Sequence, residues 1–130
     1  MYKNIINGAK FNRGEGNLKI LTEYRRGILF VRINGRLNKG NVKCLNNKVT
    51  KIVNNVGITN LVFNFNNLKD IDNKGINAIL YNYEIIKRKD GNMLICLDNN
   101  NIKNKLNRFH LLKYLGIIKD EMSAFSLMKG

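Results

Sequence analysis

Apolar and polar residues alternate in the first third of the chain. Residues 18–24 alternate weakly, and residues 28–33 form a stronger apolar run. Each pattern predicts a β-strand. The link between them, residues 25–27, ends in a glycine that can adopt a positive φ, so the economical interpretation is a β-hairpin. We expect Gly35 to end its second strand.

Three later stretches place their apolar residues on one helical face. They cover residues 42–56, about 73–90, and 102–115. The recurring i, i+3, i+4, i+7 spacing predicts an amphipathic helix in each case. Gly57 and Gly116 stand where the first and third helices should end, as glycine commonly does after a helix.

Two apolar runs, residues 61–65 and 93–97, lack alternation and so predict strands buried on both faces. Residues 117–118 suggest a short edge strand, and residues 123–128 a last helical turn. This order predicts an α/β domain with a mixed four- to five-stranded β-sheet, right-handed βα crossovers and helices mainly on one face. We expect these core side chains: Val49, Ile52, Phe63, Ile79, Leu80, Ile95, Leu106 and Phe109.

The length of 130 residues favours one domain. Residues 1–17 lack sustained periodicity and contain three glycines, so we interpret them as an N-terminal extension, flexible or loosely docked, before a domain at 18–130. The first residues are too polar for a secretory signal, and no apolar run reaches the roughly 20 residues of a membrane span. We therefore expect a cytoplasmic protein.

The chain carries 23 Lys and Arg against 9 Asp and Glu, a net charge of +14. Such a charge is typical of proteins that bind polyanions, including nucleic acids. However, the sequence is rich in Asn, Lys and Ile and has no Pro or Trp, as AT-rich codon usage would produce. The cations are also spread over every segment. We favour compositional bias and keep nucleic-acid binding as the alternative.

Residues suited to catalysis are few. His110 is the only histidine, and Cys44 and Cys96 fall inside apolar patterns, where reduced, packed thiols are expected. No second ligand stands at metal spacing, and no serine sits in a nucleophile elbow. The sequence predicts neither an enzyme nor a cofactor.

The turn between the strand at 61–65 and the following helix breaks two local preferences. Asp72 is a natural N-cap for that helix. Lys74 then puts a positive charge at the positive end of the helix dipole. Gly75 is less favourable than alanine in a helix by roughly 1 kcal/mol. Such breaks concentrate at functional sites, although drift at a tolerant surface position explains them equally well.

Together with the element order, two segments resemble the STAS domain family, the anti-sigma factor antagonists of bacteria and their stressosome relatives. They are residues 35–38, Gly-Arg-Leu-Asn, and residues 70–76, Asp-Ile-Asp-Asn-Lys-Gly-Ile. The family carries Gly-x-Leu-Asp and Asp-Ser-Ser-Gly there. The matching residues are Gly35, Leu37, Asp72, Gly75 and Ile76.

The resemblance extends over residues 18 to about 128 and implies a STAS-type single domain. It also implies a non-enzymatic module that regulates transcription, in stress response or sporulation. The implied partner is an anti-sigma factor or a GHKL-type kinase, or stressosome-like STAS proteins.

The departures from the family pattern concern its phosphorylation switch. The family's phosphorylated serine comes just before the glycine, where this sequence has Lys74. Asn73 replaces the serine before it, and Asn38 replaces the usual acidic residue. Lysine cannot accept the phosphate in this way and has the opposite charge to phosphoserine. If the family role persists, the protein is a binder without this switch.

The loops that follow parallel strands open on one edge of a sheet, so we expect them to form one partner surface. Gly75 would let another backbone come close. The predicted partner-binding residues are Asn38, Lys39, Asp72, Asn73, Lys74, Gly75, Ile76, Asp98 and Asn99.

Overall fold

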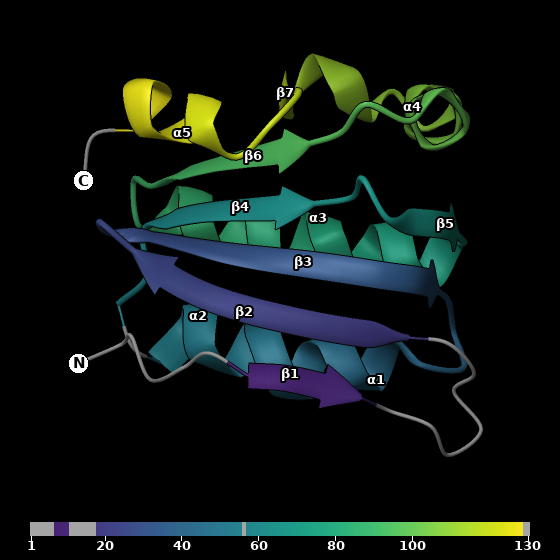
Figure 1. Ribbon diagram of the computed structural model, residues 1–130, viewed down its shortest axis with the longest axis horizontal. Coiled ribbons are helices and arrows are strands. Elements are labelled where there is room, and N and C mark those ends of the chain that lie inside the picture. Colours follow the sequence, from purple (N-terminus) through teal and green to yellow (C-terminus); the bar gives the residue numbers. More distant parts are fainter. Residues whose placement is uncertain (1–6, 11–17, 56, 129–130) are drawn as a thin grey trace.

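A mixed β-sheet runs through the centre of the molecule in the order β1-β2-β3-β4-β6-β7, with β5 paired to the end of β3 (Figure 1). This computed structural model describes residues 7–10, 18–55 and 57–128. The strands are β1 (Asn7–Lys10), β2 (Lys19–Arg25), β3 (Ile28–Leu37), β4 (Asn60–Asn64), β5 (Leu68–Ile71), β6 (Asn92–Cys96) and β7 (Gly116–Ile118). The first three strands are antiparallel neighbours, and β3, β4, β6 and β7 run parallel. The predicted α/β class is confirmed, with more strands than the four or five expected.

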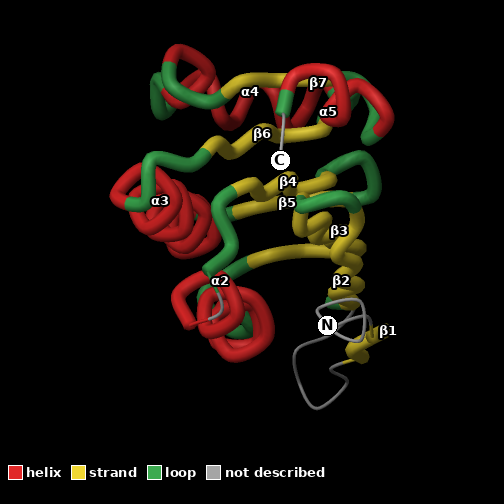
Figure 2. The backbone as a smooth tube through the Cα atoms, turned by 90° about the vertical axis from the view of Figure 1, so that its left-hand side faces the viewer, coloured by secondary structure: helices red, strands yellow, loops and turns green. Residues whose placement is uncertain are grey.

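Helices cover both faces of the sheet unequally. They are α1 (Val42–Leu45), the π-helical η2 (Asn46–Thr50), α2 (Lys51–Asn55), α3 (Asn73–Arg88), α4 (Asn100–Arg108), the 3-10 helix η3 (Leu111–Lys113) and α5 (Met122–Leu127). The run from α1 to α2 and helix α3 lie on one face (Figure 2). The short α5 closes the other face over a second apolar cluster made of Ile28, Phe30, Val62, Cys96, Ile118, Ala124 and Met128.

The predicted hairpin is confirmed, but its second strand is longer than expected. Arg26 and Gly27 both adopt positive φ, which closes the link between β2 and β3. Gly35 does not end β3. Its φ of 109° and a register shift between Gly35 and Arg36 bend the strand, which continues to Leu37 and pairs with β5. The sequence did not predict β5.

The predicted core is largely confirmed. Val49, Phe63, Ile79, Ile95 and Leu106 are fully buried, and Ile52 and Leu80 are partly buried against the core.

Phe109 is the exception, because its side chain is 44% exposed. Helix α4 ends at Arg108 and not near residue 115, and His110 adopts a left-handed backbone with φ of 59°. Leu111 beyond it, and not Phe109, enters the core.

The two thiols are buried, and neither forms a disulfide. Burial raises the pKa of Cys96 to about 11, so this thiol stays protonated at neutral pH. The prediction that both cysteines are packed in the interior is confirmed.

Strand β1 lies within the segment expected as an N-terminal extension, and it pairs with β2. Residues 1–6 and 11–17 of that segment lie outside the described residues. Among the described helices, none is both long and apolar enough to cross a membrane.

Candidate functional site

The carboxylate of Asp72 joins two loops at one edge of the sheet. Its Oδ1 accepts a hydrogen bond from the backbone N–H of Gly75 (2.9 Å), which confirms the predicted N-cap of α3. Its Oδ2 accepts from the backbone N–H of Lys39 (3.0 Å), in the loop between β3 and α1. The predicted residues around Lys39 and around Asp72 are therefore held together by one side chain.

The loop between β3 and α1 is shaped by its own asparagines. Asn38 Oδ1 accepts from the N–H of Gly40 (2.9 Å), and Asn41 Oδ1 accepts from the N–H of Asn38 (2.9 Å). Asn41 Nδ2 donates to the carbonyl of Arg36 (2.8 Å). These bonds fix the backbone that offers its N–H to Asp72 and leave the side chain of Lys39 exposed.

Gly75 is required by the packing of α3 on β3. A Cβ at this position would lie 2.8 Å from the backbone oxygen of Leu37 and 2.8 Å from Ile71 Cγ1. The backbone that approaches Gly75 is therefore the chain's own, and this explains one of the two broken preferences. Gly75 and Ile76 are both buried, so they shape the turn from beneath.

Lys74 has no comparable internal explanation. Its side chain and that of Asn73 are exposed, and the first turn of α3 contains no acidic residue. In the described part of the chain Lys74 forms no ion pair. A positive charge is thus held at the positive end of a 16-residue helix, where the N-cap Asp72 supplies the negative charge but forms no ion pair with Lys74.

A hollow of about 270 Å³, which we call the turn hollow, lies beside this turn. It is lined by Ile71, Asp72, Asn73, Lys105, Arg108 and Phe109. Lys105 forms an ion pair with Asp70 on β5, and this hydrogen-bonded contact lowers the pKa of the Asp70 carboxyl. The sequence did not predict the three lining residues from α4 and its C-cap: Phe109 was expected in the core, and the contact of Lys105 with Asp70 joins residues 35 positions apart.

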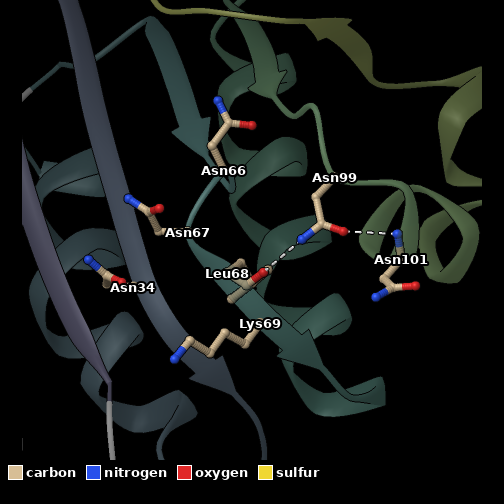
Figure 3. A pocket seen from close by; sticks show the side chains of 7 residues that line it. All are labelled: Asn34, Asn66, Asn67, Leu68, Lys69, Asn99 and Asn101. Atoms are coloured by element: carbon tan, nitrogen blue, oxygen red, sulfur yellow. Dashed lines mark hydrogen bonds between the residues drawn. The ribbon is translucent and has the colours of Figure 1, made fainter.

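A second hollow, of about 340 Å³, lies at the other end of β5 (Figure 3). We call it the amide hollow, because most of its lining residues are asparagines. They are Asn34, Asn66, Asn67, Leu68, Lys69, Asn99 and Asn101.

Asn99 and Asp98 fix the wall of the amide hollow. Asn99 Nδ2 donates to the carbonyl of Leu68 (3.3 Å), and its Oδ1 accepts from the N–H of Asn101 (2.9 Å), as Figure 3 shows. The N–H of Asp98 donates to Asn66 Oδ1 (2.7 Å). The predicted loop at 98–99 therefore borders the amide hollow.

Helix α4 runs beside β5 and connects the two hollows. Its N-cap, Asn99, bonds to Leu68 at the start of β5, Lys105 bonds to Asp70, and Phe109 reaches the turn hollow near Ile71. The two ends of β5 are about 10 Å apart at the usual rise of a strand. Of the predicted residues, Asp72 and Asn73 line the turn hollow and Asn99 lines the amide hollow, whereas the others line neither.

The chemistry at this edge suits binding. It offers amide groups, exposed cations and a half-exposed aromatic ring. Among the described residues, no group of three or more His, Cys, Asp or Glu side chains could hold a metal ion.

Comparisons with known proteins agree with the resemblance seen in the sequence. A family model described as STAS domain matches residues 19–124. An anti-sigma F factor antagonist from Paenibacillus polymyxa is 28% identical over 110 residues, which cover 85% of this chain and 94% of the relative.

Two solved structures share the fold. An anti-sigma factor antagonist from Mycobacterium paratuberculosis has a TM-score of 0.78 at 14% identity, covering 88% of this chain and 96% of that chain. The Bacillus cell fate determinant SpoIIAA in its phosphorylated form has a TM-score of 0.67 at 16% identity, covering 83% of this chain and 98% of that chain.

Proposed function

The chain belongs to the STAS domain family, and from this we propose that it antagonises an anti-sigma factor by direct binding, without a phosphorylation switch in the turn before α3. The observation that carries the proposal is the exposed Lys74 immediately before the buried Gly75, where the family has its phosphorylated serine. On this view the protein is a non-enzymatic regulator of transcription that works without a cofactor in the cytoplasm.

The geometry of the turn supports a role in binding. Asp72 fixes Lys39 and the start of α3 relative to each other, so the exposed side chains of Lys39, Asn73 and Lys74 project from a rigid base. A preorganised surface loses less entropy on binding. We include Asn38, Asp98 and Asn99 in the proposed surface.

The composition of the turn supports the absence of the switch. Residues 66–76 contain no serine, threonine or tyrosine, so no hydroxyl is available for phosphate transfer in or before the turn. Lysine carries a positive charge where phosphoserine would carry about −1.5 to −2. We therefore propose that binding is constitutive and favours an acidic partner surface.

The test uses the anti-sigma factors of the GHKL-kinase type encoded in the source genome, each purified and titrated into this protein by calorimetry. Each titration is repeated after incubation with ATP and Mg²⁺, and with a non-hydrolysable ATP analogue. We expect one of them to bind with an affinity that hydrolysable ATP leaves unchanged, and no phosphate on the protein by mass spectrometry.

The matched variant is Lys74→Ser, which restores a hydroxyl before Gly75. We expect the kinase that binds the parent to phosphorylate this variant and to release it. Failure of every such anti-sigma factor to bind the parent would refute the proposed function. A phosphate on the parent near Lys74 would refute the absence of a switch.

A further inference from the structure

We propose that the turn hollow receives a large apolar side chain from an acidic segment of the partner protein. This inference rests on the proposed function in taking the occupant to be a protein. It adds the chemistry of the segment that docks, an aromatic or large aliphatic residue flanked by carboxylates.

The size of the hollow suits a side chain. Its volume of about 270 Å³ lies below the roughly 300–1,000 Å³ typical of pockets for drug-sized ligands. Phe109 and Ile71 provide apolar lining, and the other lining residues are polar or charged. One inserted apolar side chain would cover the ring of Phe109 and leave its own flanking residues at the rim.

The exposure of Phe109 is built into the backbone. Phe109 caps α4, and the left-handed His110 redirects the chain so that Leu111 fills the core position. The ring is consequently 44% exposed beside Arg108. Aromatic residues and arginine are enriched where protein interfaces concentrate their binding energy.

The charges around the turn hollow select an acidic occupant. Both nearby carboxylates are engaged, Asp70 by Lys105 and Asp72 by two backbone N–H groups. In contrast, Arg108 and Lys74 are exposed and form no ion pair with any described residue. With a net charge of +14, a second copy of this chain would be repelled.

The experiment titrates short peptides into the ¹⁵N-labelled full chain and follows backbone amide shifts by NMR. The probes are three acetylated, amidated peptides: Asp-Glu-Phe-Glu-Asp, Asp-Glu-Ala-Glu-Asp and Lys-Lys-Phe-Lys-Lys. We expect the acidic phenylalanine peptide to shift the amides of Asn73, Lys105 and Arg108. We expect it to bind about tenfold more tightly than either other peptide.

Two pairs of variants locate the binding. Phe109→Ser should abolish the difference between the phenylalanine and alanine peptides. Tyr114→Ser, which removes a more exposed aromatic side chain that does not line the hollow, should preserve it. Arg108→Glu should weaken binding of the acidic peptides, whereas Arg88→Glu at the far end of α3 should not.

Equal binding of the two acidic peptides, equal binding of the basic peptide, or shifts confined to other residues would each overturn the inference. These outcomes are independent of the anti-sigma factor titrations. If the acidic phenylalanine peptide binds at the turn hollow while no anti-sigma factor binds, the proposed function fails and the inference stands.

Discussion

Arg25, Arg26 and Arg32 beside α5 all have internal partners. Near the turn hollow, Lys105 pairs with Asp70, but Arg108 and Lys74 form no ion pair with any described residue. Arg32 donates to Glu121 from Nε and Nη2 (2.8 Å each) and to Glu23 from Nη2 (2.8 Å). Asn64 also donates to Glu121 (2.7 Å). These contacts tie α5 to the sheet, raise the pKa of Arg32 and lower the pKa of Glu121.

The aromatic rings of the two regions differ in the same way. The guanidinium carbons of Arg25 and Arg26 each lie 5.3 Å from the ring centroid of Phe125, and the ring of Phe30 lies 5.5 Å from it. Phe125 is thus covered by cations from its own chain. Phe109 lies at the rim of the turn hollow with its ring half exposed.

This difference divides the cations behind the net charge of +14 into two groups with different roles. Part of the positive charge holds α5 in place, and part is left on the outside near the turn before α3. Composition alone cannot separate the two, because the partners of a cation depend on the fold. The following predictions test the separation, from the largest expected effect to the smallest.

Truncation of a side chain in the shared core should destabilise the α5 side and the turn hollow together, because both rest on the same sheet. Ile79 is a fully buried residue of α3, so Ile79→Ala should lower the free energy of unfolding by about 2–5 kcal/mol. Urea denaturation measures the change. Tyr81→Ala on the exposed side of α3 is the control and should cost far less. If Ile79→Ala unfolds like the parent, α3 does not pack as described.

Gly75→Ala should damage the turn but leave the α5 side intact. The added methyl group would press on Leu37 and Ile71, which should cost about 1–3 kcal/mol of stability. This penalty should exceed the roughly 1 kcal/mol that alanine gains as a helix former. Asn77→Ala, at an exposed position of the same helix, should be neutral or stabilising. Thermal melting of Gly75→Ala and Asn77→Ala, each compared with the parent, measures these changes. A Gly75→Ala variant more stable than the parent would show that α3 can move away from β3.

Glu121→Gln should loosen α5 and leave the turn hollow unchanged. Removing the carboxylate leaves the half-buried Arg32 with a weaker partner, at a cost of about 1–2 kcal/mol at neutral pH. Because folding lowers the pKa of Glu121, its contribution is present above the ordinary glutamate pKa of about 4.3 and is lost as the pH falls through the folded value.

The difference in stability between parent and Glu121→Gln should therefore shrink below about pH 4. Urea denaturation at several pH values measures it, and Glu84→Gln on the exposed side of α3 serves as the control. A difference that persists unchanged in acid would mean that packing, and not the charge, holds α5.

The main elements of the fold were predictable because their signals are local. The helical spacing of apolar residues predicted α3, and the glycine in the β2–β3 link predicted the hairpin. Strand β5 carries no such signal, since its four residues alternate neither in polarity nor in burial. It is a strand only because the bend at Gly35 lets β3 pair with it, and that bend depends on tertiary structure.

The same distinction applies to the site. Asp72 was predictable, since an N-cap acts on residues next to it in sequence. The lining from α4 was not, because Asp70 and Lys105 are 35 positions apart and Phe109 leaves the core only through the left-handed His110. The need for glycine at position 75 could not be predicted for the same reason. The backbone that excludes a Cβ there belongs to Leu37 on β3, which is distant in sequence.

Lys74→Glu should have the smallest effect on stability. It tests directly whether Lys74, unlike Arg32, lacks a partner within its own chain. If Lys74 has no partner in its own chain, a negative charge at the start of α3 should stabilise the protein by about 0.3–1 kcal/mol through the helix dipole. The matched control is Arg88→Glu in the last turn of α3, where the same change should destabilise by a similar amount. Both effects should diminish in high salt, because these side chains are exposed. Precise chemical denaturation at low and high salt measures them.

At the same time, Lys74→Glu should weaken binding of an acidic partner, so stability and affinity should change in opposite directions. A loss of stability would instead show that Lys74 serves the fold, as Arg32 does, and would remove the distinction between the two regions.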